Sequence, residues 1–388
     1  MRSRKNDSIT NQEVHGYALH WLSDNLKLED HGPKCTAAML WHIVLIAASR
    51  ITSIYAACRD LPNAPTDQAV RAALEATLPN VQILERRLNQ SLCSKLPKAL
   101  LRKSRPIAID LTLIPYHGEP LEDPSELYHS EAKSGTTKFH AYGTAYVIHR
   151  GHRYTLALTR VSGGETMDKV VQRLLKKVRD RGIRVRFLLL DKGFFSVSVV
   201  QYLKRVQCPF LMPVIMRGRP NPKNPFKGLR SFLRKRSGWY KYKMTSKDQR
   251  KTAQVKICVA NKRYCHKKTG KRKTKRLIYA CWKMCGGPIE IRETYRKRFG
   301  IESSYRQLNQ SRIRTCTRSP VIRLFYVGIA LILRNVWVWV HFTFFAHAIN
   351  NEEPEVDLEK LRFRRLLNWI QKWIEHILGS PPLCSVEI

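Results

Sequence analysis

Three acidic residues stand where they could bind metal ions. Asp110 follows the short apolar run 106–109, and Asp191 follows the apolar run 185–190 just before a glycine. Such runs are typical of buried strands, and active groups collect at the carboxyl ends of parallel strands. Because acids also cap strand ends for structural reasons, neither residue identifies a site alone. The third acid, Glu302, lies in a stretch of sequence that contains further polar residues.

Tyr295, Arg298, Glu302 and Asn309 are separated by three, four and seven positions. On a helix this spacing places them on one face. A face that joins Tyr, Arg and Glu is too polar for a core, so it is either solvated or part of a site. If it is solvated, Arg298 and Glu302 form a surface ion pair within the helix.

Carboxylates brought together repel one another unless a cation lies between them. Mg²⁺ prefers oxygen ligands, and Mn²⁺ can substitute for it. Two such ions about 3.5–4 Å apart activate one oxygen and stabilise the leaving oxygen of an in-line displacement. If Asp110, Asp191 and Glu302 lie close together in the fold, they could therefore hold such ions.

The elements that position these acids follow from periodicity. Residues 1–104 are predicted to be helical, with a core helix over 37–57 that ends before the prolines at 62 and 65. A helix over 67–78 capped by Thr66 follows, and another starts after Pro79 and Asn80. Short helices with tight turns are compatible with a helix-turn-helix and equally with any small bundle. The basic segment 95–105 reads as a linker.

A different order of elements begins at residue 106. We predict a strand to 110, a hairpin over 138–150 and 153–161, a helix over 165–181, the strand 185–190, a helix over 196–205 and a strand over 209–214. This order is that of a ribonuclease H-like (RNase H-like) fold, in which a hairpin joins a parallel crossover in one mixed sheet. The predicted class is α/β, with flanking helices around that sheet.

The remaining sequence completes the predicted organisation. Residues 217–280 contain turns and two strand-like runs, 255–260 and 276–282, and indicate a β-rich insertion. Helical pattern returns at Pro288 and continues to 349, followed by an amphipathic helix over 357–378. The expected units are an all-α DNA-binding domain over 1–104 and a catalytic domain in two parts, 105–216 and 286–349. The β-rich insertion over 217–285 separates these parts, and a C-terminal helix and tail follow over 350–388.

The formal net charge of +40, from 70 Lys and Arg against 30 Asp and Glu, predicts a polyanionic partner. A basic ribosome-like or membrane-surface protein is the alternative. Within the insertion, residues 261–275 are dense in Lys and Arg and are either DNA contacts or a solvated loop. The predicted contacts there are Lys262, Arg263, Lys271 and Arg272.

The apolar stretch 324–349 is long enough to cross a membrane, but Arg334 lies at its middle and disfavours insertion. We expect a buried helix. Ten cysteines without a framework favour a reducing compartment, so we expect a cytoplasmic, nucleoid-associated protein. Cys281 and Cys285, with Cys258, Cys265 and His266 nearby, lack the spacing of a standard zinc site, and ordinary buried thiols are favoured.

The chain resembles bacterial insertion-sequence DDE transposases that carry a Tyr-x2-Arg-x3-Glu-x6-Lys signature. Tyr295, Arg298 and Glu302 match it, whereas Asn309 stands at the position of the lysine. The stretches IAIDLTLIPYHG, LLLDKGFFS and ALILRNVWVWV are also similar, and the resemblance covers about residues 106–341.

The resemblance implies that Asp110, Asp191 and Glu302 form a metal-binding triad. It also implies that this triad catalyses metal-dependent phosphodiester hydrolysis and transesterification without a covalent protein intermediate. It also implies that Tyr295 and Arg298 contact a DNA phosphate near the cut. Arg306 or Arg312 would replace the missing lysine, beside Asn309. Implied partners are double-stranded transposon ends, target DNA and a second copy of the chain, with no membrane. An RNase H-fold nuclease that cuts without joining, or a domesticated transposase that only binds DNA, remain alternatives.

Overall fold

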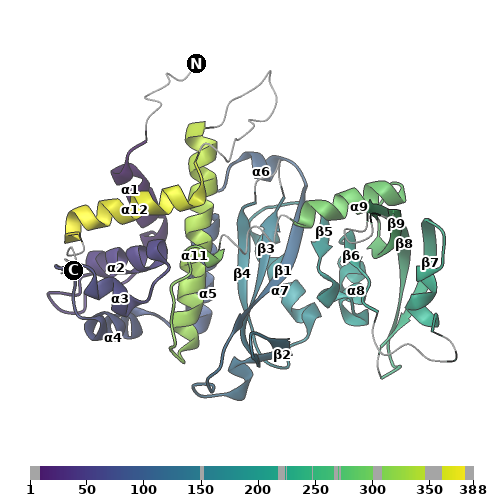
Figure 1. Cartoon of the computed structure of the whole chain (residues 1–388), viewed down its shortest axis with the longest axis horizontal. Helices are drawn as coiled ribbons and strands as arrows, with labels where there is room; N and C mark the ends of the chain where they lie inside the picture. The colour runs from purple at the N-terminus through teal and green to yellow at the C-terminus, as the bar shows by residue number, and fades with distance from the viewer. Residues whose placement is uncertain are drawn as a thin grey trace.

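The computed structural model describes residues 9–148, 153–216, 223, 225–246, 248–265, 270, 272–299, 308–345 and 361–380. Helices from both ends of the chain gather at one end of the molecule, and a nine-stranded sheet with its covering helices forms the rest (Figure 1). The helices before the sheet are α1 (Asn11–Ser23), α2 (Ala37–Arg50), α3 (Ile54–Arg59), α4 (Asp67–Thr77), α5 (Val81–Cys93) and α6 (Ala99–Arg102).

Side-chain caps set the ends of these first helices. The Thr66 side chain accepts a hydrogen bond from the backbone of α4, as predicted, and Asn80 does the same for α5. The predicted single helix over 37–57 is wrong. Ile51 adopts a left-handed conformation with φ 58°, and the Ser53 hydroxyl accepts from the Ala56 N–H, which starts α3 as a separate helix.

The sheet has the order β2-β3-β1-β5-β6-β9-β8-β7, and β4 pairs with β3. Only the β1–β5 and β5–β6 pairs are parallel. The strands are β1 (Arg105–Pro115), β2 (Tyr128–Lys133), β3 (Thr136–Val147), β4 (Thr155–Val161), β5 (Val185–Leu190), β6 (Phe210–Pro213), β7 (Gly238–Thr245), β8 (Thr252–Cys265) and β9 (Arg272–Trp282).

The predicted mixed sheet with flanking helices is confirmed. Helices α7 (Met167–Asp180) and α8 (Val197–Arg205) fall where the periodicity placed them, and β5 has the predicted bounds. The structure adds β2, a polar strand on the edge of β3, and three short 3₁₀ turns. These turns are η1 (Pro124–Glu126), η2 (Lys192–Phe194) and η3 (Gly228–Leu233).

The β-rich segment after β6 continues the same sheet. Strand β9 pairs with β6 from Trp282 to Tyr279, and β8 and β7 follow outward. Strands β8 and β9 also run further than predicted, so most of the basic run 261–275 forms the far end of a hairpin. The backbone ladder carries the strands into this polar region, where no hydrophobic alternation marks them.

The predicted helical stretch 288–349 is interrupted. Helix α9 (Pro288–Arg296) is followed by the 3₁₀ turn η4 (Lys297–Phe299), residues 312–319 are not helical, and α11 (Pro320–Val340) then leads into the π-turn η5 (His341–Phe345). Pro320 at the first helical position and the Ser319 side-chain cap begin a new helix there. Helix α12 (Phe363–Leu378) packs against α1 and α2.

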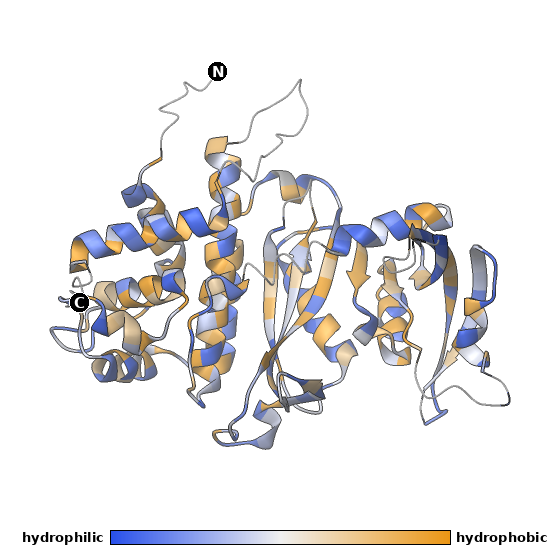
Figure 2. Ribbon diagram, in the orientation of Figure 1, coloured by the Kyte–Doolittle hydropathy of each residue, from blue (hydrophilic) through white to orange (hydrophobic). Residues whose placement is uncertain are grey.

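Helix α11 is the predicted buried helix. With η5 it is long and apolar enough to cross a membrane, yet 94% of its most apolar window is buried against the rest of the protein (Figure 2). It packs against α1, α5 and β4. The fully buried Asn335 accepts from the Thr155 N–H and donates to the Thr155 and Leu92 carbonyls, which fixes α11 to β4 and α5.

Candidate active site

Asp110 and Asp191 lie side by side on neighbouring parallel strands. The β1–β5 ladder ends with Ile109 opposite Leu190. Asp110 is the next residue of β1, and Asp191 is the first residue after β5. The prediction that β1 ends at Asp110 is wrong, because β1 continues to Pro115 along β3. The two carboxylates therefore meet where β5 stops and leaves the edge of β1 open.

The Arg298 guanidinium lies between these carboxylates. Its Nη2 is 2.7 Å from Asp110 Oδ2, and its Nη1 is 3.4 Å from Asp191 Oδ1. The Arg298 side chain is only 7% exposed, so this cation belongs to the interior of the site. The alternative pair of Arg298 with Glu302 is not tested, because Glu302 lies outside the described residues.

Tyr295 holds the arginine in place from the last turn of α9. Its hydroxyl donates to the Leu190 carbonyl at 3.3 Å and accepts from Arg298 Nη1 at 3.3 Å. The two residues do not share a continuous α-helix, because α9 ends at Arg296 and Arg298 lies in η4. Tyr295 and Arg298 still touch at a spacing of three residues, although the helix type changes between them. The hydrogen bond from Tyr295 to Leu190 connects α9 to the end of β5.

Burial raises the pKa of Asp110 to about 6. Arg298 and the Leu111 N–H, which donates to Asp110 Oδ1 at 2.9 Å, act in the opposite direction, whereas the nearby Asp191 carboxylate adds to the rise. Burial also raises the pKa of the Tyr295 hydroxyl, which stays protonated and can serve as a donor. The site thus favours the protonated form of Asp110 while it holds the Arg298 guanidinium beside this side chain.

The other predicted site residues have different positions. Glu302, Arg306 and Lys271 lie outside the described residues. Asn309 is exposed in a short helical turn, and Arg312 lines a small cavity with His140 and Arg323 near the end of β1. The predicted contacts Lys262, Arg263 and Arg272 are exposed on the β8–β9 hairpin.

The described residues contain no cluster of three or more His, Cys, Asp or Glu side chains that could hold a metal ion. Cys258 and Cys281 are buried, and burial raises the pKa of both thiols, to about 12 for Cys258. Neutral thiols of this kind do not favour zinc. Asp110 and Asp191 do fit a hard cation, since their oxygens are the ligands that Mg²⁺ prefers and they already hold one positive group.

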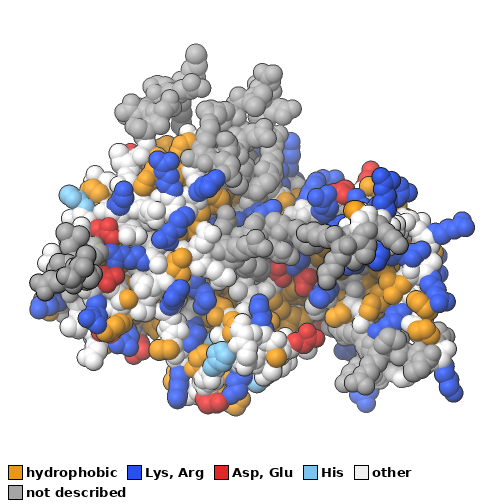
Figure 3. Space-filling view, viewed as in Figure 1, with side chains coloured by type: hydrophobic (Ala, Val, Ile, Leu, Met, Phe, Trp, Pro, Cys, Tyr) orange, Lys and Arg blue, Asp and Glu red, His pale blue; other side chains and the backbone are white. Residues whose placement is uncertain are grey.

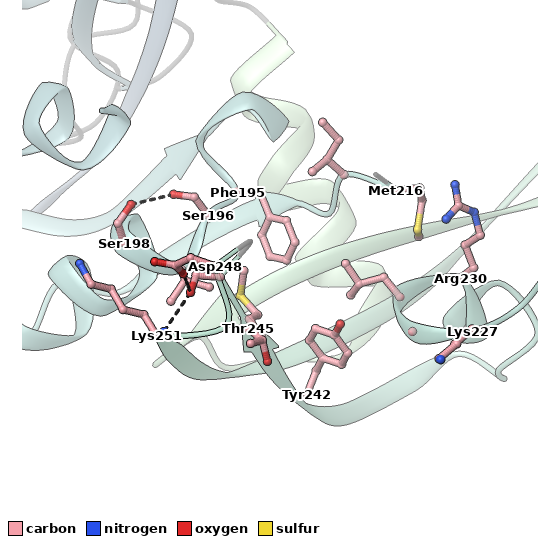
Figure 4. A pocket seen from close by; sticks show the side chains of 16 residues that line it. Phe195, Ser196, Ser198, Met216, Lys227, Arg230, Tyr242, Thr245, Asp248 and Lys251 are labelled. Carbon is pink, nitrogen blue, oxygen red and sulfur yellow. Dashed lines mark hydrogen bonds between the residues drawn. The ribbon is translucent and has the colours of Figure 1, made fainter. Parts of the chain in front are cut away.

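Two cavities lie near the elements that carry Asp191 and Tyr295. A groove of about 910 Å³ borders Tyr295 and runs between α9 and the β8–β9 hairpin. A second cavity of about 510 Å³ lies between the start of α8, η3 and β7. In it the rings of Phe195 and Tyr242 face the same space, and Ser196 and Ser198 hydrogen-bond to each other at 3.2 Å (Figure 4).

Sequence reasoning missed two basic side chains of the 910 Å³ groove, Arg292 and Arg296 of α9. The available signal was their spacing of four residues, which places both on one face of a helix.

A mixed sheet that presents paired aspartates at the end of a parallel ladder is the arrangement predicted for a DDE enzyme. The comparison of sequences agrees, because the profile of the family described as "Transposase DDE domain" matches residues 101–336, more than half of the chain. The chain belongs to this family, so it is a DDE transposase, an enzyme family that acts on DNA in transposition.

No curated protein matches the chain. Among solved structures, it is similar to the piggyBac transposase in a cryo-EM structure of a synaptic complex with hairpin DNA. That match has a TM-score of 0.49 and 12% sequence identity, and it covers 96% of this chain and 80% of the other. The prediction of a DDE transposase is confirmed by the family match. The bacterial insertion-sequence group, its four-residue signature and the division into domains stay predictions.

Proposed function

We propose that this transposase cuts DNA at the ends of an insertion sequence and joins the freed 3′-OH to target DNA. In this proposal Asp110, Asp191 and Glu302 hold Mg²⁺, which Mn²⁺ can replace, within an RNase H-like catalytic domain. One observation carries the proposal: two carboxylates converge at the end of the β1–β5 ladder around a buried positive group. Such a pair is costly to build unless a cation completes it.

The bound ions would supply an activated oxygen nucleophile and stabilise the oxygen that leaves. The chain's own residues orient the substrate. Arg298 presents a planar fork that matches a phosphate as well as a carboxylate. A DNA phosphate that enters beside Asp110 and Asp191 therefore competes with them for this guanidinium. Tyr295 keeps the fork at the end of β5 during the exchange.

DNA binding outside the cut is assigned to the basic surface. Lys and Arg side chains gather over the end of the molecule that carries α9, β8 and β9 (Figure 3). On the hairpin, Lys262, Arg263 and Arg272 are exposed and would contact phosphates. Lys271, which lies outside the described residues, is proposed to do the same. We further propose that the N-terminal helices contact DNA, that two copies of the chain pair two ends, and that the protein is cytoplasmic and nucleoid-associated.

The experiment measures cleavage of labelled duplexes that carry the DNA flanking the gene on each side. We expect Mg²⁺-dependent nicking, and Asp110→Asn or Asp191→Asn should abolish it without weakening DNA binding. Asp180→Asn is the matched control, since Asp180 lies at the exposed end of α7 and pairs only with Lys176 among the described residues. Full cleavage by both site variants would refute the assignment.

Joining is tested separately with a pre-cut end. An end that carries a 3′-OH should be inserted into a plasmid, whereas the same end with a 3′-deoxy terminus should not. Cleavage without insertion would support the alternative of an RNase H-fold nuclease. Binding without either reaction would support a domesticated DNA-binding protein.

A further inference from the structure

A small cavity lies on the same face of the sheet as Asp110, further along β1. Ile114 lines it, and side chains an even number of positions apart leave a strand on one face. His140, which stands opposite Ile114 in the β1–β3 register, lines it as well. Arg312 and Arg323 reach it from the segment before α11 and from the first turn of this helix. None of the described residues that line the cavity is acidic.

Arg323 is fixed at this cavity by two neutral partners. Its side chain is buried, and its Nε donates to the Thr317 carbonyl at 2.6 Å. Its guanidinium lies over the Tyr116 ring, 4.5 Å from the ring centre. No carboxylate is among the groups that act on its charge. The positive charge of Arg323 is therefore held in the interior without a counter-ion among the described residues.

Arg312 brings a second positive charge to the same cavity. Its Nε is buried and has no hydrogen-bond partner in the described part of the chain. Burial lowers the pKa of Arg312, and the neighbouring Arg323 lowers it further. The Tyr142 hydroxyl acts in the opposite direction, but burial raises its own pKa to about 12, so it is neutral at ordinary pH. Two guanidinium groups thus share a site to which no described carboxylate contributes.

His140 adds a further donor to this cluster. Its side chain is 3% exposed, and its Nε2 is buried with no hydrogen-bond partner among the residues that the structure describes. Burial lowers the pKa of His140 to about 3, and the nearby Arg323 and Arg160 act in the same direction. The neutral ring can carry its one N–H at Nε2. Unpaired buried charges and donors are costly unless something that accepts hydrogen bonds fills the space between them.

The size of the cavity limits what can fill it. Its volume is about 10 Å³, whereas a single water molecule needs about 10–15 Å³. A phosphate group, with four oxygens around its phosphorus, is too large, so the DNA backbone is not the occupant. A water molecule fits but does not offset two positive charges. A chloride ion is slightly larger and carries the missing charge, and the partly exposed Arg312 side chain makes room for it by a small movement.

We propose that this cavity binds one monatomic anion, chloride under ordinary conditions, between the guanidinium groups of Arg312 and Arg323, with the His140 ring as a further donor. The ion supplies the negative charge that the lining residues lack. Arg312 is thereby assigned to an anion within the fold and not to a DNA phosphate. The inference goes beyond the proposed function, because it concerns a site that neither cuts nor contacts DNA.

The bound ion connects three parts of the chain. His140 belongs to β3, which pairs with the strand that carries Asp110. Arg312 belongs to the non-helical segment 312–319, and Arg323 to the beginning of α11. Helix α11 runs beside β4, the strand next to β3 (Figure 1). The anion therefore stabilises the docking of the segment before α11 on the sheet, and its loss weakens the folded state.

Urea unfolding of the full chain counts the ion when sodium chloride replaces sodium gluconate at constant total concentration. Gluconate has the same charge but is too large for the cavity. One chloride bound only to the folded state lowers the equilibrium constant of unfolding about tenfold for each tenfold rise in chloride above its dissociation constant. Arg312→Gln should remove this dependence. Arg318→Gln is the matched control and should retain it, because Arg318 is exposed in the same segment and does not line the cavity.

Crystals of the full chain grown in bromide locate the ion, since bromide replaces chloride and scatters anomalously. We expect an anomalous peak between the guanidinium groups of Arg312 and Arg323. A cavity that holds only water in these crystals overturns the inference. So does a chloride dependence of unfolding that Arg312→Gln leaves unchanged, or that Arg318→Gln removes equally. Both measurements are made without DNA or divalent metal, so their outcome is independent of the cleavage results that decide the proposed function.

Discussion

Replacing Asp110 by asparagine should stabilise the fold while it abolishes cleavage. The carboxyl of Asp110 has a pKa of about 6 in the folded protein, against an ordinary value of 3.8. The folded state therefore holds this proton more tightly than the unfolded state does. Stability from this group is fully present below pH 3.8 and is lost as the pH rises through 6.

The size of the effect follows from the shift. A difference of about 2.2 pKa units at 1.36 kcal/mol each gives about 3 kcal/mol of lost stability above pH 6. The Asp110 side chain is 15% exposed, so solvent screens this penalty little. Asparagine resembles the protonated acid in shape and charge. We expect Asp110→Asn to gain up to about 3 kcal/mol at pH 8 and little at pH 4.

Urea unfolding at pH 4, 6 and 8 in EDTA measures the difference between the variant and its parent. Asp180→Asn, at an exposed position on α7, should change stability by less than about 1 kcal/mol at every pH. A gain for Asp110→Asn that is independent of pH, or a loss at pH 8, would refute the reasoning, because either result means that burial of the charge is not the dominant effect.

Four further outcomes are expected. Arg298→Lys keeps the charge but cannot bridge two carboxylates, so cleavage should fall at least about tenfold in a labelled-end assay; unchanged cleavage would make the bridge irrelevant. Asn335→Ala leaves buried backbone groups without their partner and should cost about 2–3 kcal/mol by denaturant unfolding. Gly328→Ala places a methyl group against the side chain of Leu88 and should cost about 1–3 kcal/mol, part of which Leu88→Ala should restore in the double variant. Added Mg²⁺ should raise the melting temperature, and Asp191→Asn should blunt that rise; an equal rise in both proteins would place the ion elsewhere.

Local signals in the sequence were enough for the elements that hold the aspartates. An apolar run bounded by polar residues defined β5, and side-chain caps defined the starts of α4 and α5. Strand β2 was missed because it is an exposed polar edge strand, which exists through pairing with β3 and carries no hydrophobic alternation. The break at Ile51 was missed because a left-handed residue leaves no compositional signal when it is not glycine.

The site was predicted only in part. The expected ends of two parallel strands brought Asp110 and Asp191 together. The two residues do meet, although only β5 ends there and β1 continues to Pro115. The bridging position of Arg298 depends on how η4 docks against β1 and β5, which are more than a hundred residues away in sequence. Its spacing from Tyr295 indicated that the two side chains touch, but not which carboxylates they face.

The pairing of β6 with β9 fixes the distance between Asp110 and the outer strands of the sheet. Four inter-strand steps separate β1, which carries Asp110, from β8. At about 4.8 Å per step, that distance is about 19 Å. One strand of B-form DNA rises about 3.4 Å per nucleotide, so the span corresponds to five or six nucleotides. Because hydrogen-bonded strands fill the whole interval, the distance from Asp110 to strand β8, measured across the strands, is set by the architecture of the sheet.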